Sequence, residues 1–216
     1  MTTDGAEPDF SILLEGNPSA PSKPTRSTAV EKEERAMNDL CRAEDAHGRG
    51  IPAGLHSILG ITRGIRLPIQ STAAVQAVGS HRGGFLLLLG PPGTGKTFAS
   101  ALWAWKRKGF LMKATVLASL DHFSKDGQHD LDLALAQHPL VIDDLGSERP
   151  DPHGYWAARL DEIIDIRFDY GTTTGTIITS NLSASALNRR VGERVWDRMA
   201  GGTVISCDGP SLRGPR

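Results

Sequence analysis

The pattern of apolar and polar positions separates a polar N-terminal part from a longer part in which apolar runs alternate with amphipathic stretches. Short continuous apolar runs are typical of strands buried on both faces of a parallel sheet. Such runs predict strands at residues 85–89, 114–117, 140–143, 175–181 and 203–206. Apolar residues at helical spacing predict helices at residues 71–78, 98–108, 131–137 and 155–170. This alternation indicates an α/β fold with a parallel sheet.

The helix predicted at residues 155–170 shows its apolar face most clearly. Charged and small residues fill the remaining positions, so that one side suits a core and the other suits water. We expect five residues to face inward: Trp156, Leu160, Ile163, Ile164 and Phe168.

The N-terminal part has a different composition. Residues 1–26 are rich in Pro, Ser, Gly and Asp, which predicts disorder, and their apolar patch at 10–14 is either a docking motif or part of a loose tail. A capping box at 28–31 begins a predicted amphipathic helix, which either binds a partner protein or folds back on its own domain. After a Gly- and Pro-punctuated linker, the part with alternating predicted strands and helices follows. We therefore expect an N-terminal extension at 1–50 and a domain at 51–216.

The most informative motif lies between a predicted strand and a predicted helix. The sequence GPPGTGKT fits the phosphate-binding pattern G-x-x-x-x-G-K-[ST] and has the required flanks. Its glycines allow backbone N–H groups to approach phosphate, Lys96 can reach the β- and γ-phosphates, and the Thr97 hydroxyl can ligate Mg²⁺. The motif predicts binding of a nucleotide with Mg²⁺ by Gly90, Pro91, Pro92, Gly93, Thr94, Gly95, Lys96 and Thr97.

A second motif, HPLVIDDLG, is an apolar strand that ends in two acids. We expect Asp143 to hold Mg²⁺ directly or through water, and Asp144 to orient the attacking water. Glutamate usually takes the second role, so the shorter Asp144 predicts slow hydrolysis or a shifted base. Glu148 either assists or is a solvent-exposed loop acid, and the exposed loop acid is the simpler interpretation.

Polar residues near the C-terminus offer further candidates. Asn181 follows a predicted strand, where it contacts the γ-phosphate or its water, or instead caps the next helix. Arg189, Arg190, Arg194 and Arg198 crowd a short helical region, and the last two share a face. This group is a solvated basic face, a DNA-facing patch, or the source of an arginine finger that stabilises transition-state charge at a neighbouring subunit.

Composition narrows the class of protein further. The formal net charge of −1 gives no sign of a general nucleic-acid binder. Cys41 and Cys207 have neither metal-site nor redox-motif spacing, so we expect two reduced thiols. The sequence shows no secretory signal and no apolar run of membrane-spanning length, so we expect a cytoplasmic protein without membrane contact. The candidates for DNA contact, which are better explained as scattered surface charges, are Lys106, Arg107, Lys108 and Lys113.

Taken together, GPPGTGKT, LVIDDLGSE, TIITSNLS and GERVWDRM…SLR resemble the AAA+ ATPases of the DnaC/IstB group over about residues 50–213. The resemblance implies a P-loop NTPase with a five-stranded parallel sheet between helices and no C-terminal helical lid. It also implies nucleotide at subunit interfaces of a homo-oligomer, and binding of single-stranded DNA. The implied roles are Walker A for Lys96 and Thr97, Walker B for Asp143 and Asp144, sensor 1 for Asn181, arginine finger for Arg198, and sensor 2 for Arg213.

This resemblance predicts an ATPase that loads a replicative DNA helicase, with ATP binding driving assembly and hydrolysis driving release. The N-terminal region would contact the helicase. One alternative is a transposase helper of the same fold. Another is a nucleotide-gated adaptor that hardly hydrolyses ATP, which the shorter Asp144 keeps open.

Overall fold

The computed structural model describes residues 29–59, 61, 72–120, 132, 139–149, 151, 153–169 and 174–212. The chain forms two compact units, Met1–Ser71 and Thr72–Arg216. The boundary between the units lies later than the predicted domain boundary at residue 50, because residues 51–59 and 61 belong to the first unit. The functional division at residue 50 stays a prediction.

The first unit is built on one long helix. Helix α1 (Ala29–Gly48) is followed by a short 3₁₀ turn, η2 (Ala53–Leu55). Ala46 and Ile51 are buried, and the His56 ring bonds the Ile51 carbonyl at 3.0 Å. Farther up the helix, Met37 and Leu40 are 61% and 54% exposed. The predicted helix is therefore present, and part of its apolar face is open to solvent.

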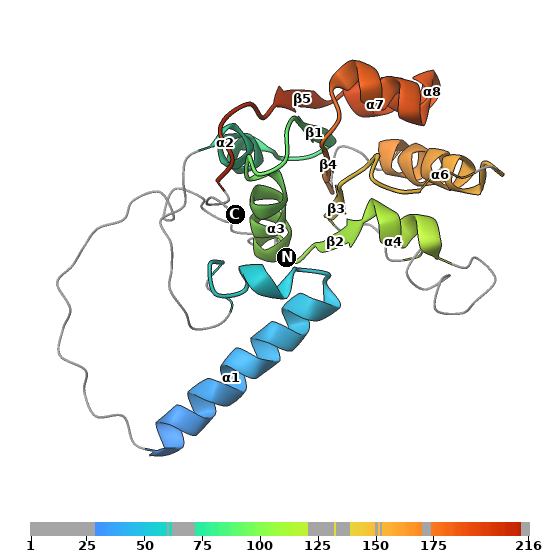
Figure 1. Ribbon diagram of the computed structural model, residues 1–216. Helices are drawn as coiled ribbons and strands as arrows, with labels where there is room; N and C mark the ends of the chain where they lie inside the picture. The colour runs from blue at the N-terminus through green and yellow to red at the C-terminus, as the bar shows by residue number, and fades with distance from the viewer. Residues whose placement is uncertain are drawn as a thin grey trace, which may run out of the picture. The chain divides into compact units, whose positions relative to one another are not determined.

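The second unit contains the predicted parallel sheet, with strands in the order β2-β3-β4-β1-β5 (Figure 1). Every recorded pairing in it is parallel. Strand β1 is buried along its whole length and lies between β4 and β5. The strands are β1 (Phe85–Leu89), β2 (Phe110–Lys113), β3 (Leu140–Asp143), β4 (Thr176–Ser180) and β5 (Thr203–Ser206).

Helices cover both faces of the sheet, as expected for an α/β fold. In Figure 1, α2 and α3 lie on one side, and α4, α6, α7 and α8 lie on the other. On the second side, Trp156, Leu160, Leu187 and Met199 pack with the sheet in one core cluster. The helices are α2 (Ala73–Ser80), α3 (Lys96–Lys106), α4 (Ala114–Ser119), α6 (Tyr155–Asp169), α7 (Ala184–Val191) and α8 (Glu193–Ala200). The predicted α/β fold with a five-stranded parallel sheet is confirmed.

One predicted strand is wrong. Residues 114–117 belong to helix α4, and the second strand is the preceding segment Phe110–Lys113. That segment pairs with β3 residue by residue, from Phe110 opposite Leu140 to Lys113 opposite Asp143. The buried Ala114 and Leu117 then lie three positions apart on one helix face. The helix predicted at 131–137 lies almost entirely outside the described residues.

The core-facing set predicted for α6 is wrong at one position. Four of the five residues are buried, but Phe168 is 51% exposed. Its neighbour Arg167 is 1% exposed and donates hydrogen bonds to the Thr176 hydroxyl at 2.9 Å and the Gly175 carbonyl at 2.8 Å. Burial lowers the pKa of Arg167 to about 10. A paired arginine therefore occupies the inward position at the end of the helix.

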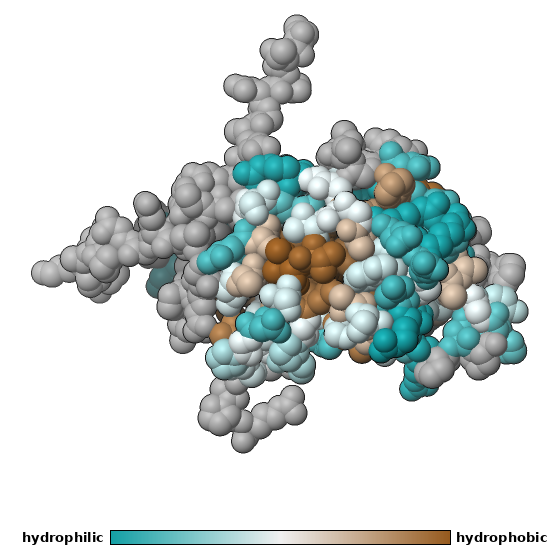
Figure 2. Space-filling model, turned by 90° about the horizontal axis from the view of Figure 1, so that it is seen from above, coloured by the Kyte–Doolittle hydropathy of each residue, from teal (hydrophilic) through white to brown (hydrophobic). Residues whose placement is uncertain are grey.

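Strand β5 is an edge strand of the sheet. Strand β5 pairs with β1, and Thr203, Val204 and Ser206 on it are exposed. Figure 2 shows apolar side chains gathered on one face of the protein and surrounded by hydrophilic ones. Patches of this kind are typical of protein contact sites.

Among the described residues, no helix is both long and apolar enough to cross a bilayer.

Candidate functional site

The phosphate-binding loop connects β1 to α3, as predicted. Gly90, Gly93 and Gly95 have φ values of +135°, +90° and +88°, a region that glycine adopts without strain. Lys96 is 4% exposed, and its ammonium donates to the carbonyls of Gly90 and Pro91 at 2.7 Å each. The lysine is thus held beneath the loop, and the N-terminus of α3 follows directly. This geometry suits a bound phosphate.

The loop is joined to the end of β3 by hydrogen bonds. Thr97 donates its hydroxyl hydrogen to Asp143 Oδ1 at 2.9 Å, and Thr179 of β4 donates to the same oxygen at 2.7 Å. Asp143 is 1% exposed and Thr179 is fully buried. The C-terminal ends of two neighbouring strands therefore meet the first turn of α3. Thr179 is a member of this site that the sequence analysis missed, although its place in TIITSN, two residues before Asn181, was a usable signal.

The two hydroxyls also act on the charge of Asp143. Burial raises the pKa of this carboxyl group, and the hydrogen bonds from Thr179 and Thr97 oppose that rise by stabilising the ionised form. A carboxylate and a hydroxyl oxygen are hard ligands of the kind Mg²⁺ prefers. The residues present at Thr97 and Asp143 therefore fit the predicted metal.

Asp144 lies in a tight turn directly after β3. Its φ is +58°, which is unusual for a residue other than glycine. Its N–H donates to the Thr179 hydroxyl at 2.9 Å, and its Oδ1 accepts from the Asn181 amide at 2.9 Å. The structure therefore brings together two of the predicted catalytic residues, Asp144 and Asn181.

The alternative interpretation of Asn181 as a helix cap is wrong. The cap of α7 is Ser183, whose side chain accepts from the N–H of Ala186 at 3.3 Å. Asn181 is exposed at the end of β4 and is bonded to Asp144. A phosphate or water contact by Asn181 stays a prediction.

Glu148 is not the solvent-exposed loop acid that we expected. The residue is 5% exposed, and its Oε2 accepts the Gly146 N–H at 2.8 Å. Arg190 of α7 contacts it twice, from Nε to Oε1 at 3.4 Å and from Nη2 to the Glu148 carbonyl at 2.8 Å. The pair links the turn after β3 to α7.

The predicted arginine finger is part of a cluster of four charges between α6 and α8. Arg198 contacts Asp165 at 2.5 Å and Asp161 at 3.5 Å. Arg194 contacts the same acids, at 2.7 Å from Asp161 and 3.5 Å from Asp165. The Arg198 side chain is 23% exposed and that of Arg194 is 63% exposed. The two arginines share a helix face, as predicted.

The segment after β5 lies along the phosphate-binding loop, which the sequence analysis did not predict. The Cys207 N–H donates to the Leu89 carbonyl at 2.6 Å, and the Leu212 N–H donates to the Gly93 carbonyl at 2.8 Å. A Cβ atom on Gly90 would meet the Cys207 carbonyl at 2.7 Å. Residues 207–212 contain no helix, and Arg213 lies outside the described residues. The chain thus reaches the loop immediately before the predicted sensor 2 position.

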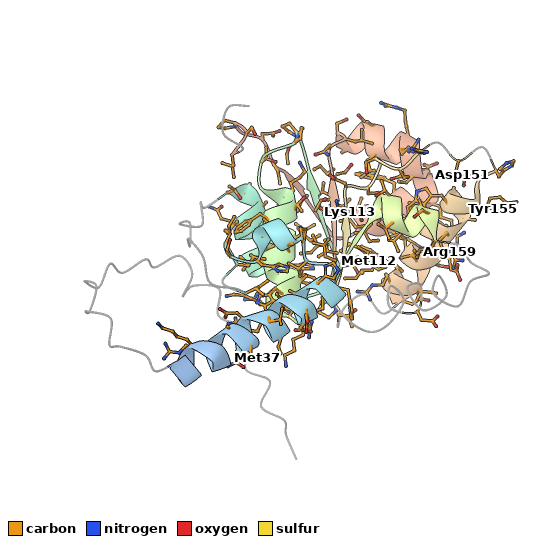
Figure 3. All side chains as sticks on the ribbon, turned by 60° about the horizontal axis from the view of Figure 1, so that its bottom comes forward. Met37, Met112, Lys113, Asp151, Tyr155 and Arg159 are labelled. Atoms are coloured by element: carbon orange, nitrogen blue, oxygen red, sulfur yellow. The ribbon has the colours of Figure 1, made fainter. Side chains whose placement is uncertain are left out.

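The basic candidates for DNA contact do not form one group. Lys113 ends β2, level with Asp143 at the site edge of the sheet (Figure 3). Lys106, Arg107 and Lys108 lie at the other end, where α3 terminates. Arg107 donates to the His81 carbonyl at 3.2 Å. These four residues therefore do not define a single basic surface.

A cavity of about 540 Å³ borders the turn after β3. Its wall includes Leu117 of α4, Ser147 and Glu148 of the turn, and the aromatic residues Tyr155 and Trp156 that begin α6. Figure 3 shows Asp151 and Tyr155 together at this end of α6. The cavity thus combines an aromatic wall with polar groups.

Comparison with known proteins gives matches among solved structures. Neither a protein-family model nor a curated protein matches the sequence. The DnaC helicase loader matches with a TM-score of 0.50 and 26% identity, over 62% of this chain and 85% of that chain. DnaI matches with a TM-score of 0.50 and 22% identity, over 65% of this chain and 81% of that chain. DnaA bound to AMPPCP and single-stranded DNA matches with a TM-score of 0.51 and 16% identity, over 64% of this chain and 47% of that chain.

The fold is that of the AAA+ ATPases. The strand order β2-β3-β4-β1-β5, with the phosphate-binding loop after β1, is typical of the AAA+ P-loop core. The chain is structurally similar to helicase loaders and to a replication initiator. The resemblance stated from the motifs is therefore confirmed at the level of the fold.

Proposed function

We propose that this protein is an AAA+ ATPase that binds ATP with Mg²⁺ and loads a replicative DNA helicase. The observation that carries the proposal is the hydrogen bond from Thr97 to Asp143, which joins the phosphate-binding loop to the acid after β3. Likeness to the DnaC helicase loader supports the cellular role. Such a role belongs in the cytoplasm.

The site residues divide the chemistry between them. The loop amides and Lys96 bind the phosphates, with Gly90, Gly93 and Gly95 allowing close approach. Thr97 and Asp143 hold Mg²⁺, which neutralises charge on the phosphates when bound. Asp144 and Asn181, already bonded to each other, orient the attacking water. Pro91, Pro92 and Thr94 complete the loop, and we assign the sensor 2 role to Arg213.

Assembly of the protein into a homo-oligomer would complete the site. Arg198 supplies positive charge to the nucleotide of a neighbouring subunit, and in the single chain Asp161 and Asp165 hold its guanidinium. The γ-phosphate competes with these carboxylates for the arginine. Binding of ATP therefore favours the assembled state, and hydrolysis weakens it.

DNA and helicase binding draw on other surfaces. The DnaA structure contains single-stranded DNA, which supports the same ligand class here. The cavity beside Tyr155 and Trp156 offers aromatic surface on which an unpaired base can stack. We assign helicase contact to the extension at 1–50, where α1 exposes Met37 and Leu40.

Hydrolysis tests the nucleotide site directly. Lys96→Ala should abolish ATP binding or turnover, measured as phosphate release with and without single-stranded DNA. Lys32→Ala is the matched control, because Lys32 is exposed on α1 and should leave turnover unchanged. Normal ATPase activity in Lys96→Ala would refute the proposal, and a wild type that binds ATP but never hydrolyses it would favour the adaptor.

The finger assignment has its own test. Arg198→Ala should keep ATP affinity and lose most stimulated hydrolysis, by about 10³-fold or more if it acts as fingers do elsewhere. Arg159→Ala is the control: it removes an arginine on α6 that is also ion-paired, and it should leave hydrolysis unchanged. Unchanged turnover in Arg198→Ala would remove the assignment.

The partner is tested by capture. Tagged Asp144→Asn protein with ATP should hold the assembled state while a host lysate is passed over it. Recovery of a hexameric replicative helicase, lost when residues 1–50 are deleted, would establish the loader. Recovery of a transposase instead would move the function to the transposition helper.

A further inference from the structure

Glu148 is a buried charge that the proposed chemistry does not use. Its side chain is 2% exposed, and each carboxylate oxygen has a different partner. Oε2 accepts the Gly146 N–H from within the turn, and Oε1 faces Arg190 from α7. Burying a carboxylate is costly unless it is paired and hydrogen-bonded, so these contacts hold it in one place.

The turn that Glu148 closes is the turn that carries Asp144. Leu145 donates its N–H to the Thr179 carbonyl at 2.8 Å, and Ser147 donates its N–H to the Asp144 carbonyl at 3.1 Å. Gly146 has a φ of +96°, and its N–H is the one bonded to Glu148. The turn is therefore fixed to β4 on one side and to the Glu148 carboxylate on the other.

The same carboxylate links the turn to α7, and through α7 to α8, the helix that carries Arg194 and Arg198. Arg190 lies on α7, and α7 packs against α8, which carries Arg194 and Arg198. Arg190 also donates to the Glu148 carbonyl at 2.8 Å, so both the side chain and the backbone of Glu148 are bound to α7. Two contacts to one guanidinium fix direction as well as distance.

We infer that Glu148 is a positioning residue for Asp144, and that its pair with Arg190 fixes the Asp144 turn to α7. This inference rests on the proposed ATPase function and adds a residue to it. Lys96 is held within the phosphate-binding loop by its hydrogen bonds to the carbonyls of Gly90 and Pro91. Loss of Glu148 should therefore disturb the water-orienting acid and leave ATP binding intact.

The expected effect is a selective loss of turnover. Displacing a catalytic group by about 1 Å can reduce rate by about 10²-fold, so Glu148→Gln should lower kcat by about 10- to 100-fold. Glutamine keeps an acceptor for Gly146 but loses the charge that pairs with Arg190. Dissociation constants for a fluorescent ATP analogue should stay within about twofold of wild type, because the residues that bind phosphate are unchanged.

The experiment measures kcat, KM, analogue affinity and thermal unfolding for wild type, Glu148→Gln, Arg190→Gln and the double variant. Arg190→Gln should reproduce the loss, and the double variant should lose little more, because the two side chains act as one unit. Arg190 is less buried than Glu148 and gives a folded variant if Glu148→Gln does not fold. Glu162→Gln, which removes a 51% exposed acid from a surface pair, is the matched control and should behave as wild type.

A second cycle separates positioning from general stability. In an Asp144→Asn background, Glu148→Gln should cause almost no further loss of the residual turnover, because the group that it positions is already altered. A full additional loss there, a wild-type kcat in Glu148→Gln, or a parallel fall in affinity would each overturn the inference. Wild type with no more turnover than Lys96→Ala would instead overturn the proposed function itself.

Discussion

Replacing Thr179 by valine removes one hydroxyl at the centre of the site and keeps the shape of the side chain. The hydroxyl donates to Asp143 at 2.7 Å and accepts from the Asp144 N–H at 2.9 Å. A hydrogen bond to a charged group contributes about 1.5–3 kcal/mol, and an unpaired buried donor costs about 1–3 kcal/mol. Asp144 is only half-buried, so water can recover part of the second loss. We expect Thr179→Val to lower the free energy of unfolding by about 2–4 kcal/mol.

The same substitution should shift the pH dependence of activity. Thr179 stabilises the ionised form of Asp143, so its removal raises a pKa that burial already raises. Metal binding needs the ionised carboxylate, and the acid limb of the Mg²⁺-dependent rate should therefore move to higher pH. The shift is read from the acid limb of rate profiles recorded at a fixed Mg²⁺ concentration.

Urea unfolding measures the loss of stability, and Thr203→Val is the control. Thr203 is exposed on β5, so the same chemical change there should alter stability by less than about 0.5 kcal/mol. Wild-type stability together with an unshifted acid limb in Thr179→Val would refute the role given to this hydroxyl.

Three further predictions concern folding, each measured by thermal or urea unfolding. Burial and nearby arginines lower the His81 pKa from 6.5 to about 4, so between these values the unfolded state takes up a proton that the folded state does not. The free energy of unfolding should therefore have its full value above pH 6.5 and fall as the pH drops toward 4, and the fall should be less steep in His81→Gln. Gly93→Ala should lower the free energy of unfolding by about 1–3 kcal/mol, because the Gly93 φ is +90° and Ser211 fills the space that a Cβ atom would take. Gly54 has open space at that position, so Gly54→Ala should cost little, and equal effects of the two substitutions would contradict this reasoning. Arg167→Met should cost about 1–3 kcal/mol because the buried Thr176 hydroxyl and the Gly175 carbonyl each lose a hydrogen bond, and a stable variant would contradict that.

The sequence was sufficient where a motif is contiguous. The phosphate-binding loop and the acids at the end of β3 lie in unbroken stretches, and their places beside the sheet follow from the local pattern. The contact of Asn181 with Asp144 also follows, because parallel strands end at one edge of the sheet. The chemical roles of these residues, and those of Arg198 and Arg213, stay predictions.

The sequence was insufficient where long-range packing decides. Residues 114–117 suit a strand by composition, but pairing with β3 selects the four residues before them. Glu148 has the sequence context of a loop acid, but it is buried and paired with Arg190, which lies far along the chain. Phe168 fits the helical period, yet Arg167 is buried because Thr176 and Gly175 supply its partners.

The course of residues 207–212 has a practical consequence for any engineered version of this protein. Leu212 is hydrogen-bonded to Gly93, so whatever is joined after it starts beside the phosphate-binding loop. An affinity tag, a fluorescent protein or a surface-attachment linker placed there would compete for the space needed by the triphosphate. A small dye attached at Leu212, which is exposed, would instead serve as an optical reporter of nucleotide occupancy.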